Sequence, residues 1–312
     1  MLNTLRTSLR TGRVTSSYPD EPDIATAYRG RPEIDPERCD CTGACVEACS
    51  SGAITLVPAE SGARRWQLDL ARCVFCGLCA EVCPNSALEI TSDFELATRS
   101  RDDLIIGVTH QAPDQLGAEM LPARGVKAPV SSAPSVTAET LGRRLSHRIW
   151  SLLRRSLHIR HLDAGSDNSS DWEIASLLNP VYDVQRLGID FVASPRHADL
   201  LLVTGAVTRH LERALQATYE AMPSPGLVVA VGADACGGGV LQGSYAVAGG
   251  VDRCLPVDVY IPGDPPRPQA LIFGLLVALN RLEPKLQHRE LVTTAAQGNN
   301  RGECAGEPSG RS

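Results

Sequence analysis

The chain has 312 residues, which at roughly 150 residues per domain indicates about two domains. Hydrophobic residues make up 43% of it but aromatic residues only 4%, so we expect a mostly aliphatic core. A net charge of −6 argues against a protein that coats nucleic acid. The longest apolar run, residues 271–279, is shorter than the about 18 residues of a membrane-spanning helix, and the N-terminus lacks the apolar region of a secretory signal. We therefore expect neither a transmembrane segment nor export.

Cysteine is the most informative residue type. The chain has 11 cysteines, and eight of them fall between Cys39 and Cys83. Because no export signal is visible, disulfides are not expected, and clustered cysteines instead indicate metal ligands.

The N-terminal segment, residues 1–28, is expected to form an amphipathic or extended arm. Leu2, Leu5 and Leu9 have helical spacing, with arginines between them. This pattern fits either a solvated terminus or a helix that docks to an interface or a partner.

The cysteine-rich segment, residues 29–105, contains an internal repeat. Each copy has a cysteine motif followed by a short β-prone run, at residues 52–57 and 87–91. In the second copy, Cys73, Cys76, Cys79 and Cys83 precede Pro84 with the spacing of bacterial ferredoxins. A zinc ribbon is the alternative, but zinc sites favour two separated cysteine pairs. The motif therefore predicts iron–sulfur clusters.

The first copy is irregular. It contains Cys39, Cys41, Cys45 and Cys49, but Thr42 stands at the expected second ligand position and Cys41 lies one residue early. Three alternatives follow for its cluster: a normal four-iron cluster bound by a shifted loop, a three-iron cluster, or a four-iron cluster with an altered reduction potential.

Ferredoxin motifs exchange their last cysteine between two clusters, so we expect crossed ligation. One predicted [4Fe-4S] cluster takes Cys39, Cys45, Cys83 and, as a displaced candidate, Cys41. The other takes Cys49, Cys73, Cys76 and Cys79.

The rest of the chain is expected to form one further domain. Residues 106–141 have the Pro-, Ala- and Ser-rich composition of a linker, and residues 286–312 that of a disordered tail. Residues 142–161 carry six arginines and no acid, which fits either a solvated basic face or a surface that docks to an acidic partner or an anionic membrane.

Within residues 142–285, short apolar strands alternate with helices, which predicts a mainly parallel, flavodoxin-like α/β sheet after an α+β ferredoxin-like domain. The expected helices lie near residues 172–178, 208–221 and 267–282. The expected strands are Leu157–Leu162, Phe191–Ala193, Leu200–Thr204, Leu227–Val231 and Val257–Ile261.

Two families resemble different parts of the chain. Residues 9–19, 28–32 and 94–104, together with the double cysteine motif, resemble the ferredoxin subunit of formate hydrogenlyase and the I-type ferredoxin subunit of complex I. Residues 154–166, 191–205 and 256–263 resemble the small subunit of group 4 membrane-bound hydrogenases and its B-type counterpart in complex I. The chain thus resembles a fusion of two electron-carrying subunits.

This resemblance implies an iron–sulfur electron-transfer subunit with no complete active site of its own. The implied partners are a large catalytic subunit and membrane proton-pumping subunits, with no nucleic acid. The implied location is cytoplasmic, peripheral on the inner face of the cell membrane. One alternative is a ferredoxin domain that serves an external redox partner beside a cluster-free scaffold domain. A weaker alternative is a metal- or redox-sensing module.

The second resemblance also implies a missing cluster. The family's four cluster cysteines correspond here to Asp167, Ser170, Asp234 and Asp264. Clusters are held by thiolates, so no third cluster is expected. The replaced site is an internally hydrogen-bonded pocket, a site for Mg²⁺ or Ca²⁺, or, from the Gly- and Ser-rich turn alone, a flavin phosphate cradle.

Overall fold

A computed structural model describes residues 6–7, 10–12, 14–19, 28–58, 64–110, 146–147 and 149–280. Several predictions from the sequence lie outside these residues: the leucine face of the N-terminal arm, the linker from 111 onward, the start of the basic run and the tail. Among the described helices, none has the length and apolar character needed to span a membrane.

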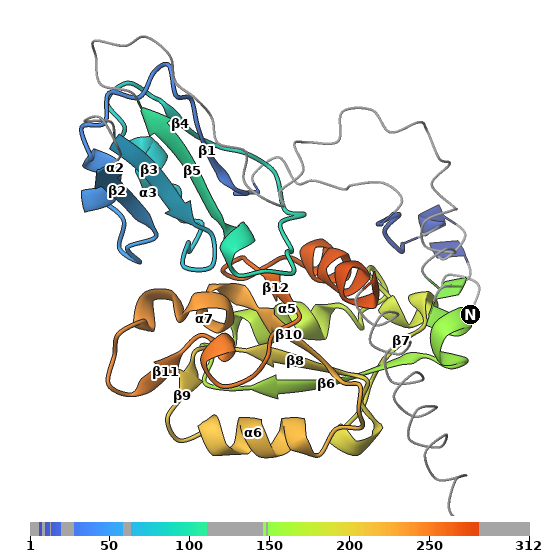
Figure 1. The fold of residues 1–312 in the computed structure, drawn as a ribbon. Coiled ribbons are helices and arrows are strands. Elements are labelled where there is room, and N and C mark those ends of the chain that lie inside the picture. Colours follow the sequence, from blue (N-terminus) through green and yellow to red (C-terminus); the bar gives the residue numbers. More distant parts are fainter. Residues whose placement is uncertain are drawn as a thin grey trace, which may run out of the picture.

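The cysteine-rich part contains two small antiparallel sheets and two short helices (Figure 1). Strand β5 (Ile105–His110) includes residues 106–110, which were expected in the linker, and all of its residues pair with β3 (Arg64–Asp69). One sheet contains β1 (Pro32–Ile34) and β4 (Leu88–Ile90); the other contains β2 (Ile54–Pro58), β3 (Arg64–Asp69) and β5 (Ile105–His110); the helices are α2 (Ala44–Glu47) and α3 (Leu78–Glu81), and a 3-10 turn, η2 (Asp102–Leu104), precedes β5.

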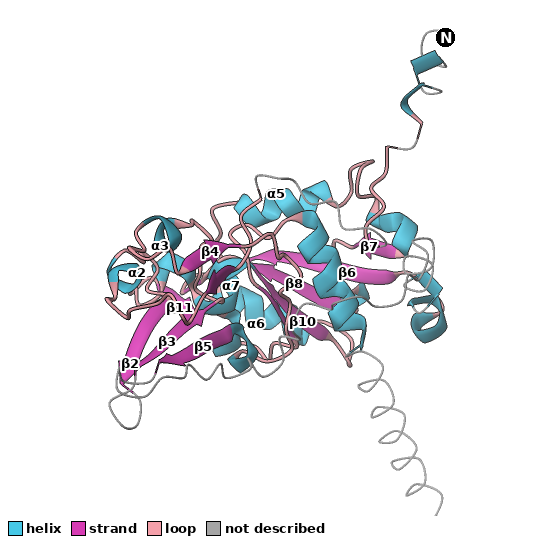
Figure 2. Ribbon diagram, turned by 90° about the horizontal axis from the view of Figure 1, so that it is seen from above, coloured by secondary structure: helices cyan, strands magenta, loops and turns pink. Residues whose placement is uncertain are grey.

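The internal repeat of the sequence is also a repeat of backbone conformation. Helix α2 follows Gly43, with φ of 87°, and helix α3 follows Gly77, with φ of 84°. Glycine adopts this left-handed conformation without the steric cost that a Cβ imposes. Each sharp turn folds its cysteine loop back against a short helix, and α2 and α3 lie together at one end of the molecule (Figure 2).

The second part contains a five-stranded parallel sheet in the order β12-β10-β8-β6-β7. The chain therefore builds outward from β6 in both directions, and the switch point lies between β6 and β8. The strands are β6 (Leu157–Asp163), β7 (Ile189–Phe191), β8 (Leu200–Thr204), β10 (Leu227–Val231) and β12 (Val259–Ile261).

The expected strands match this sheet closely. The predictions for β8 and β10 have the observed bounds, because all five residues of each strand are buried and, apart from Thr204, apolar. The prediction at Phe191–Ala193 is two residues late, since β7 begins directly after the turn at Gly188. The prediction at Val257 is two residues early, because the carboxylate of Asp258 accepts a hydrogen bond from Val228 N before β12 begins.

The two faces of the sheet belong to different hydrophobic clusters. Leu200 and Leu202 of β8 pack with helix α5 (Ser169–Ser176) and the helix at residues 268–280. Leu201 and Val203 belong to the cluster that contains Leu215 of helix α6 (Glu212–Glu220) and residues of the cysteine-rich part. In Figure 1, α6 covers one face and α5 and the C-terminal helix cover the other.

Several short elements have no clear signal in the sequence, because each contains too few residues to show a period. They are α7 (Gly232–Gly237), the antiparallel pair β9 (Val207–Thr208) and β11 (Val247–Gly249), and the 3-10 turns η3 (Val184–Leu187), η4 (Pro195–His197), η5 (Gly239–Leu241) and η6 (Val251–Arg253).

The two parts of the chain meet by direct backbone contact. Thr98 and Tyr260 exchange backbone hydrogen bonds of 3.0 and 2.9 Å, so the segment after β4 covers the edge strand β12. Gly237, at the end of α7, packs so closely on Ala71 that a Cβ built on it would lie 2.5 Å from the Ala71 carbonyl oxygen. This contact places α7 beside the chain that leads into Cys73.

We predict that Gly237→Ala destabilises the chain by about 1–3 kcal/mol, because the added methyl group collides with backbone rather than with a flexible side chain. In an unobstructed helix the same change would stabilise by about 0.5–1 kcal/mol, so the sign of the effect reports the contact. Denaturant unfolding measures it. Gln216→Ala on the exposed face of α6 is the control and should stay within about 0.5 kcal/mol. A more stable Gly237→Ala protein would contradict the packing described here.

Candidate iron–sulfur and carboxylate sites

The eight clustered cysteines divide between two cavities. Each cavity is lined by four of these cysteines together with apolar side chains. Cys39, Cys41, Cys45 and Cys83 line the first cavity. Cys49, Cys73, Cys76 and Cys79 line the second cavity. Each cavity thus combines cysteines from both copies of the repeat, which is the grouping that crossed ligation requires.

Backbone N–H groups point at several of the sulfur atoms. Ala53 N lies 3.2 Å from Cys49 Sγ, and Ala87 N lies 3.2 Å from Cys83 Sγ. In the second cavity, Phe75 N lies 3.4 Å from Cys73 Sγ. Hydrogen bonds of this kind stabilise thiolates and tune the reduction potential of a bound cluster.

The protein environment disfavours free thiolates at these positions. Burial raises the pKa of Cys73 to about 12 and that of Cys79 to about 11, and neighbouring cysteines add to both shifts. Burial also raises the pKa of Cys45, and that of Cys41 to about 11, with Cys39 as the next cause for Cys41. Thiolates gathered in apolar cavities therefore need positive charge beside them, which iron supplies when it binds.

The arrangement fits a cluster better than a single ion. Among the described residues, no three His, Cys, Asp or Glu side chains converge closely enough to hold one metal ion. The four cysteines of each set instead stand around a cavity.

The indole N–H of Trp66 supports the same reading of the first cavity. It is buried and makes no hydrogen bond of ordinary geometry within the described part of the chain. Burial raises the pKa of the neighbouring Cys45 thiol, and the indole N–H opposes this shift. A buried donor beside a thiol-lined space fits metal-bound thiolate sulfur, which accepts hydrogen bonds.

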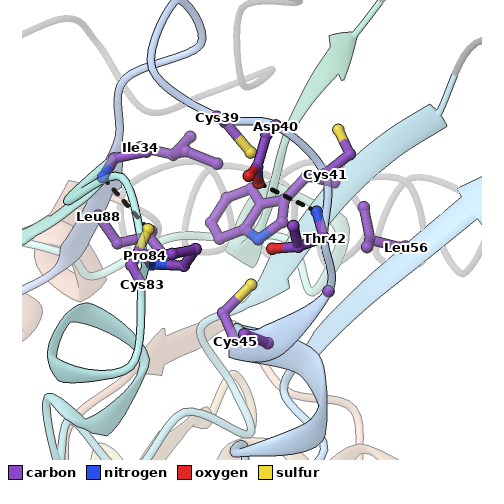
Figure 3. Close-up of a pocket in the computed structure, with 14 residues that line it drawn as sticks. Ile34, Cys39, Asp40, Cys41, Thr42, Cys45, Leu56, Cys83, Pro84 and Leu88 are labelled. Carbon is purple, nitrogen blue, oxygen red and sulfur yellow. Dashed lines mark hydrogen bonds between the residues drawn. The ribbon is translucent and has the colours of Figure 1, made fainter.

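The irregular first motif places Thr42, rather than Cys41, toward the other cysteines. In Figure 3, the Thr42 side chain points into the space between Cys45 and Cys83, and the Cys41 sulfur projects away from both. Cys41, the displaced ligand candidate, also lines this cavity, and its thiol lies near that of Cys39.

The four residues that the resemblance places at the family's cluster-cysteine positions lie in one region of the α/β domain. Asp167 and Ser170 lie at the start of α5, Asp234 lies on α7, and Asp264 follows β12. The buried Ser170 hydroxyl lies 2.7 Å from where a Cβ on Gly232 would stand, so the start of α5 packs directly on the start of α7.

The three carboxylates of this region repel one another. Although the Asp264 side chain reaches solvent, partial burial raises its pKa to about 6, and Asp234 and Asp167 contribute further. Burial, followed by the charge of Asp167, also raises the pKa of Asp234. Hydrogen bonds from Ser169 hold the pKa of Asp167 low. Protonation of Asp264 therefore relieves the repulsion.

Arg267, three residues after Asp264, makes its contacts elsewhere. Its guanidinium lies over the rings of Tyr28 and Phe94, at 4.9 and 5.0 Å, and its Nε donates to Gln269. These contacts hold the cysteine-rich part against the α/β domain. The sequence contains no spacing signal for this contact, because its members lie far apart along the chain.

The loop after β6 does not offer a free phosphate cradle. Its amides at Gly165 and Ser166 donate to the Asp163 carboxylate, both at 2.7 Å, and Ser169 N donates to Asp167 at 2.9 Å. A flavin phosphate would need these donors and would meet carboxylates in their place. The geometry therefore disfavours the flavin alternative.

Comparison with known proteins agrees with this division of the chain. A family model described as "4Fe-4S dicluster domain" matches residues 27–87. A second, described as "NADH ubiquinone oxidoreductase, 20 Kd subunit", matches residues 168–278. The first match covers both cysteine motifs, and the second covers most of the α/β domain.

Individual relatives carry hydrogenase names. Formate hydrogenlyase subunit 7 of Escherichia coli is 37% identical over 167 residues, which are 54% of this chain and 63% of that protein. A probable membrane-bound hydrogenase subunit, mbhJ of Pyrococcus furiosus, is 44% identical over 143 residues, 45% of this chain and 86% of the relative. A solved structure of a membrane-bound sulfane sulfur reductase, an archaeal respiratory membrane complex, is 33% identical over 45% of this chain and 76% of its own, with a TM-score of 0.38.

These findings define an iron–sulfur protein that joins a dicluster domain to a domain with a five-stranded parallel sheet. The chain belongs to the family that contains the membrane-bound hydrogenase small subunits and the 20 Kd subunit of NADH ubiquinone oxidoreductase. The resemblance noted in the sequence is thereby confirmed for both parts.

We predict that Asp264→Asn raises the melting temperature at about pH 8 but leaves it unchanged at about pH 4. The pKa of Asp264 is about 6 in the folded chain and 3.8 ordinarily. Ionised Asp264 therefore lowers the stability of the folded chain at pH values above about 6. Asparagine resembles the protonated form, which carries no charge. The increase in melting temperature should be smaller than about 2–4 °C, the change that 1 kcal/mol of stability produces in a protein of this size. It is small because solvent screens the partly exposed side chain. Glu220→Gln on α6 is the control and should leave the melting temperature unchanged. An equal gain at both pH values would contradict this assignment.

Proposed function

We propose that this chain carries electrons through two [4Fe-4S] clusters as the peripheral arm of a membrane-associated complex related to group 4 hydrogenases or complex I. The observation that carries the proposal is the division of eight cysteines between two cavities, each lined by both motifs. When bound, the clusters supply one-electron transfer. The chain's own residues hold them, exclude water and donate hydrogen bonds to sulfur.

The proposed ligands follow from the cavity linings. Cys49, Cys73, Cys76 and Cys79 form a complete set for the cluster of the second cavity. Cys39, Cys45 and Cys83 hold the cluster of the first cavity, where Cys41 and Thr42 compete for the fourth position.

The fold also supports a direction for electron transfer. Ala71 touches Gly237 of α7 and lies two residues before Cys73, so the second cavity is the one joined to the α/β domain by backbone contact. Cys76 is exposed, and Leu78 and Val82 beside it are exposed apolar residues. We propose that electrons pass through this cluster last before they leave the dicluster domain.

The α/β domain is proposed to carry no third cluster, because Asp167, Ser170, Asp234 and Asp264 supply no thiolate. Its strand order, in which the first strand lies between the second and third, supports the flavodoxin-like assignment, and the two-motif repeat supports the ferredoxin-like one. The proposed partners are a large catalytic subunit and membrane proton-pumping subunits, on the cytoplasmic face of the membrane.

The alternative is that the dicluster domain serves an external redox partner and the α/β domain is a scaffold. The exposed apolar residues beside Cys76 favour it, because a diffusible partner could reach the second cavity there. Copurification with a large subunit, followed by timing of electron transfer between the two, distinguishes the alternatives. Reduction of the large subunit through this chain supports the proposal, and a large subunit that stays oxidised beside reduced clusters supports the scaffold alternative.

We predict that the anaerobically reconstituted full chain binds about eight iron and eight sulfide ions and shows spin-coupled EPR signals when reduced. Cys79→Ala, in the second cavity, should lower the iron content to about four. Cys254→Ala is the matched control, because Cys254 lines neither cavity, and should retain about eight. An unchanged iron content in Cys79→Ala would contradict the ligand assignment.

We also predict that Trp66→Phe lowers the reduction potential of the first-cavity cluster. The substitution keeps the aromatic packing but removes a buried N–H donor beside the Cys45 sulfur, and hydrogen bonds to sulfur favour the reduced cluster. An EPR-monitored redox titration measures the potential of each cluster. The second-cavity cluster is the internal control, and a shift confined to it would contradict the placement of Trp66.

A further inference from the structure

The two cysteine motifs share one backbone conformation despite their different sequences. Cys41 has φ of 56° and Phe75 has φ of 53°, and each lies two residues before the left-handed glycine that starts a helix. Both are non-glycine residues in a region that L-residues rarely adopt. The loop of the first motif is therefore not shifted to bring Cys41 forward, and the two motifs align residue by residue.

The alignment continues beyond the helices. The amide of Ala53 donates to Cys49 Sγ, four residues earlier, as the amide of Ala87 donates to Cys83 Sγ, at the same distance of 3.2 Å. The two motifs therefore align from Cys41 with Phe75 to Cys49 with Cys83. In this alignment, Thr42 of the first motif stands at the backbone position that Cys76 has in the second motif.

Hydrogen bonds hold this loop in place. The carboxylate of Asp40 accepts from Thr42 N at 3.1 Å, drawn as a dashed line in Figure 3. The carbonyl oxygen of Cys41 accepts from Arg64 Nη1 at 3.2 Å. Both bonds involve the peptide group between Cys41 and Thr42, so turning this peptide to bring the Cys41 thiol to the position of the Thr42 side chain would break them.

We infer that the first cavity holds a cluster with only three cysteine ligands, Cys39, Cys45 and Cys83, in which Thr42 occupies the fourth ligand position and Cys41 is no ligand. The inference rests on the proposed function, in which both cavities hold clusters. A neutral hydroxyl binds iron more weakly than a thiolate does. One iron of this cluster is therefore removable, whereas all four irons of the second cluster are held by cysteine.

The chemical consequence is a selective conversion by a one-electron oxidant such as ferricyanide. A [4Fe-4S]²⁺ cluster held in the first cavity would give one electron to ferricyanide and lose one Fe²⁺, leaving [3Fe-4S]⁺ and ferrocyanide. The iron lost would be the one at the ligand position of Thr42, because Cys39, Cys45 and Cys83 would hold the other three. Added Fe²⁺ and a reductant reverse the step.

The test uses the full chain reconstituted anaerobically to about eight irons. Ferricyanide should release about one iron per chain and produce the EPR signal of one oxidised three-iron cluster per chain. Thr42→Cys should suppress both the release and the signal, because it restores a fourth thiolate. Cys41→Gly removes the thiol and suits the positive φ, and it should behave as the unaltered chain does.

The opposite results overturn the inference. Oxidation-resistant clusters in the unaltered chain, or loss of the first cluster in Cys41→Gly, would make Cys41 a ligand. Cys76→Thr is a second variant, which should add the same lability to the second cavity and release about two irons. An iron content of about four before oxidation would contradict the proposed function, which requires two clusters. Two four-iron clusters that both resist ferricyanide would contradict only this inference.

Discussion

The structure depends on gathering eight thiols into two apolar cavities within about fifty residues of chain. Buried thiols resist ionisation, so these cavities are costly unless iron compensates the thiolate charge. The two left-handed glycines, Gly43 and Gly77, make the gathering possible, because they fold each cysteine loop back onto a short helix. The small sheets then close around the loops, with buried Trp66 and Leu68 of β3 in the core.

The α/β domain is joined to this dicluster domain more closely than a flexible linker would allow. Backbone bonds between Thr98 and Tyr260, the Ala71–Gly237 contact and the stacking of Arg267 on Tyr28 and Phe94 all cross the boundary. Such contacts fix the distance between redox centres and whatever docks on the α/β domain. On the α/β side of this boundary, Asp167, Asp234 and Asp264 form a charged region in which the pKa of Asp264 is raised to about 6.

Much of this could be predicted from the sequence, for reasons that differ by region. The motif from Cys73 to Cys83 has a spacing that few other sites use, and β8 and β10 are short, almost wholly apolar runs of the kind typical of buried parallel strands. The role of Trp66 and the contact of Gly237 could not be predicted, because both depend on residues distant in the chain. The choice between Thr42 and Cys41 needed backbone dihedral angles, which spacing does not contain. The linker boundary was placed too early because residues 106–110 pair with β3 and not with a neighbour in sequence.

The central claim is that this chain is a two-cluster carrier joined to a cluster-free domain, and its iron and sulfide content tests that claim most directly. Chemical analysis of the anaerobically purified full chain, with Mössbauer spectroscopy to assign the iron to clusters, should find about eight irons, or about seven if the first cluster has lost its removable iron. About twelve irons would mean that the region of Asp167, Asp234 and Asp264 holds a third cluster, and would contradict the account.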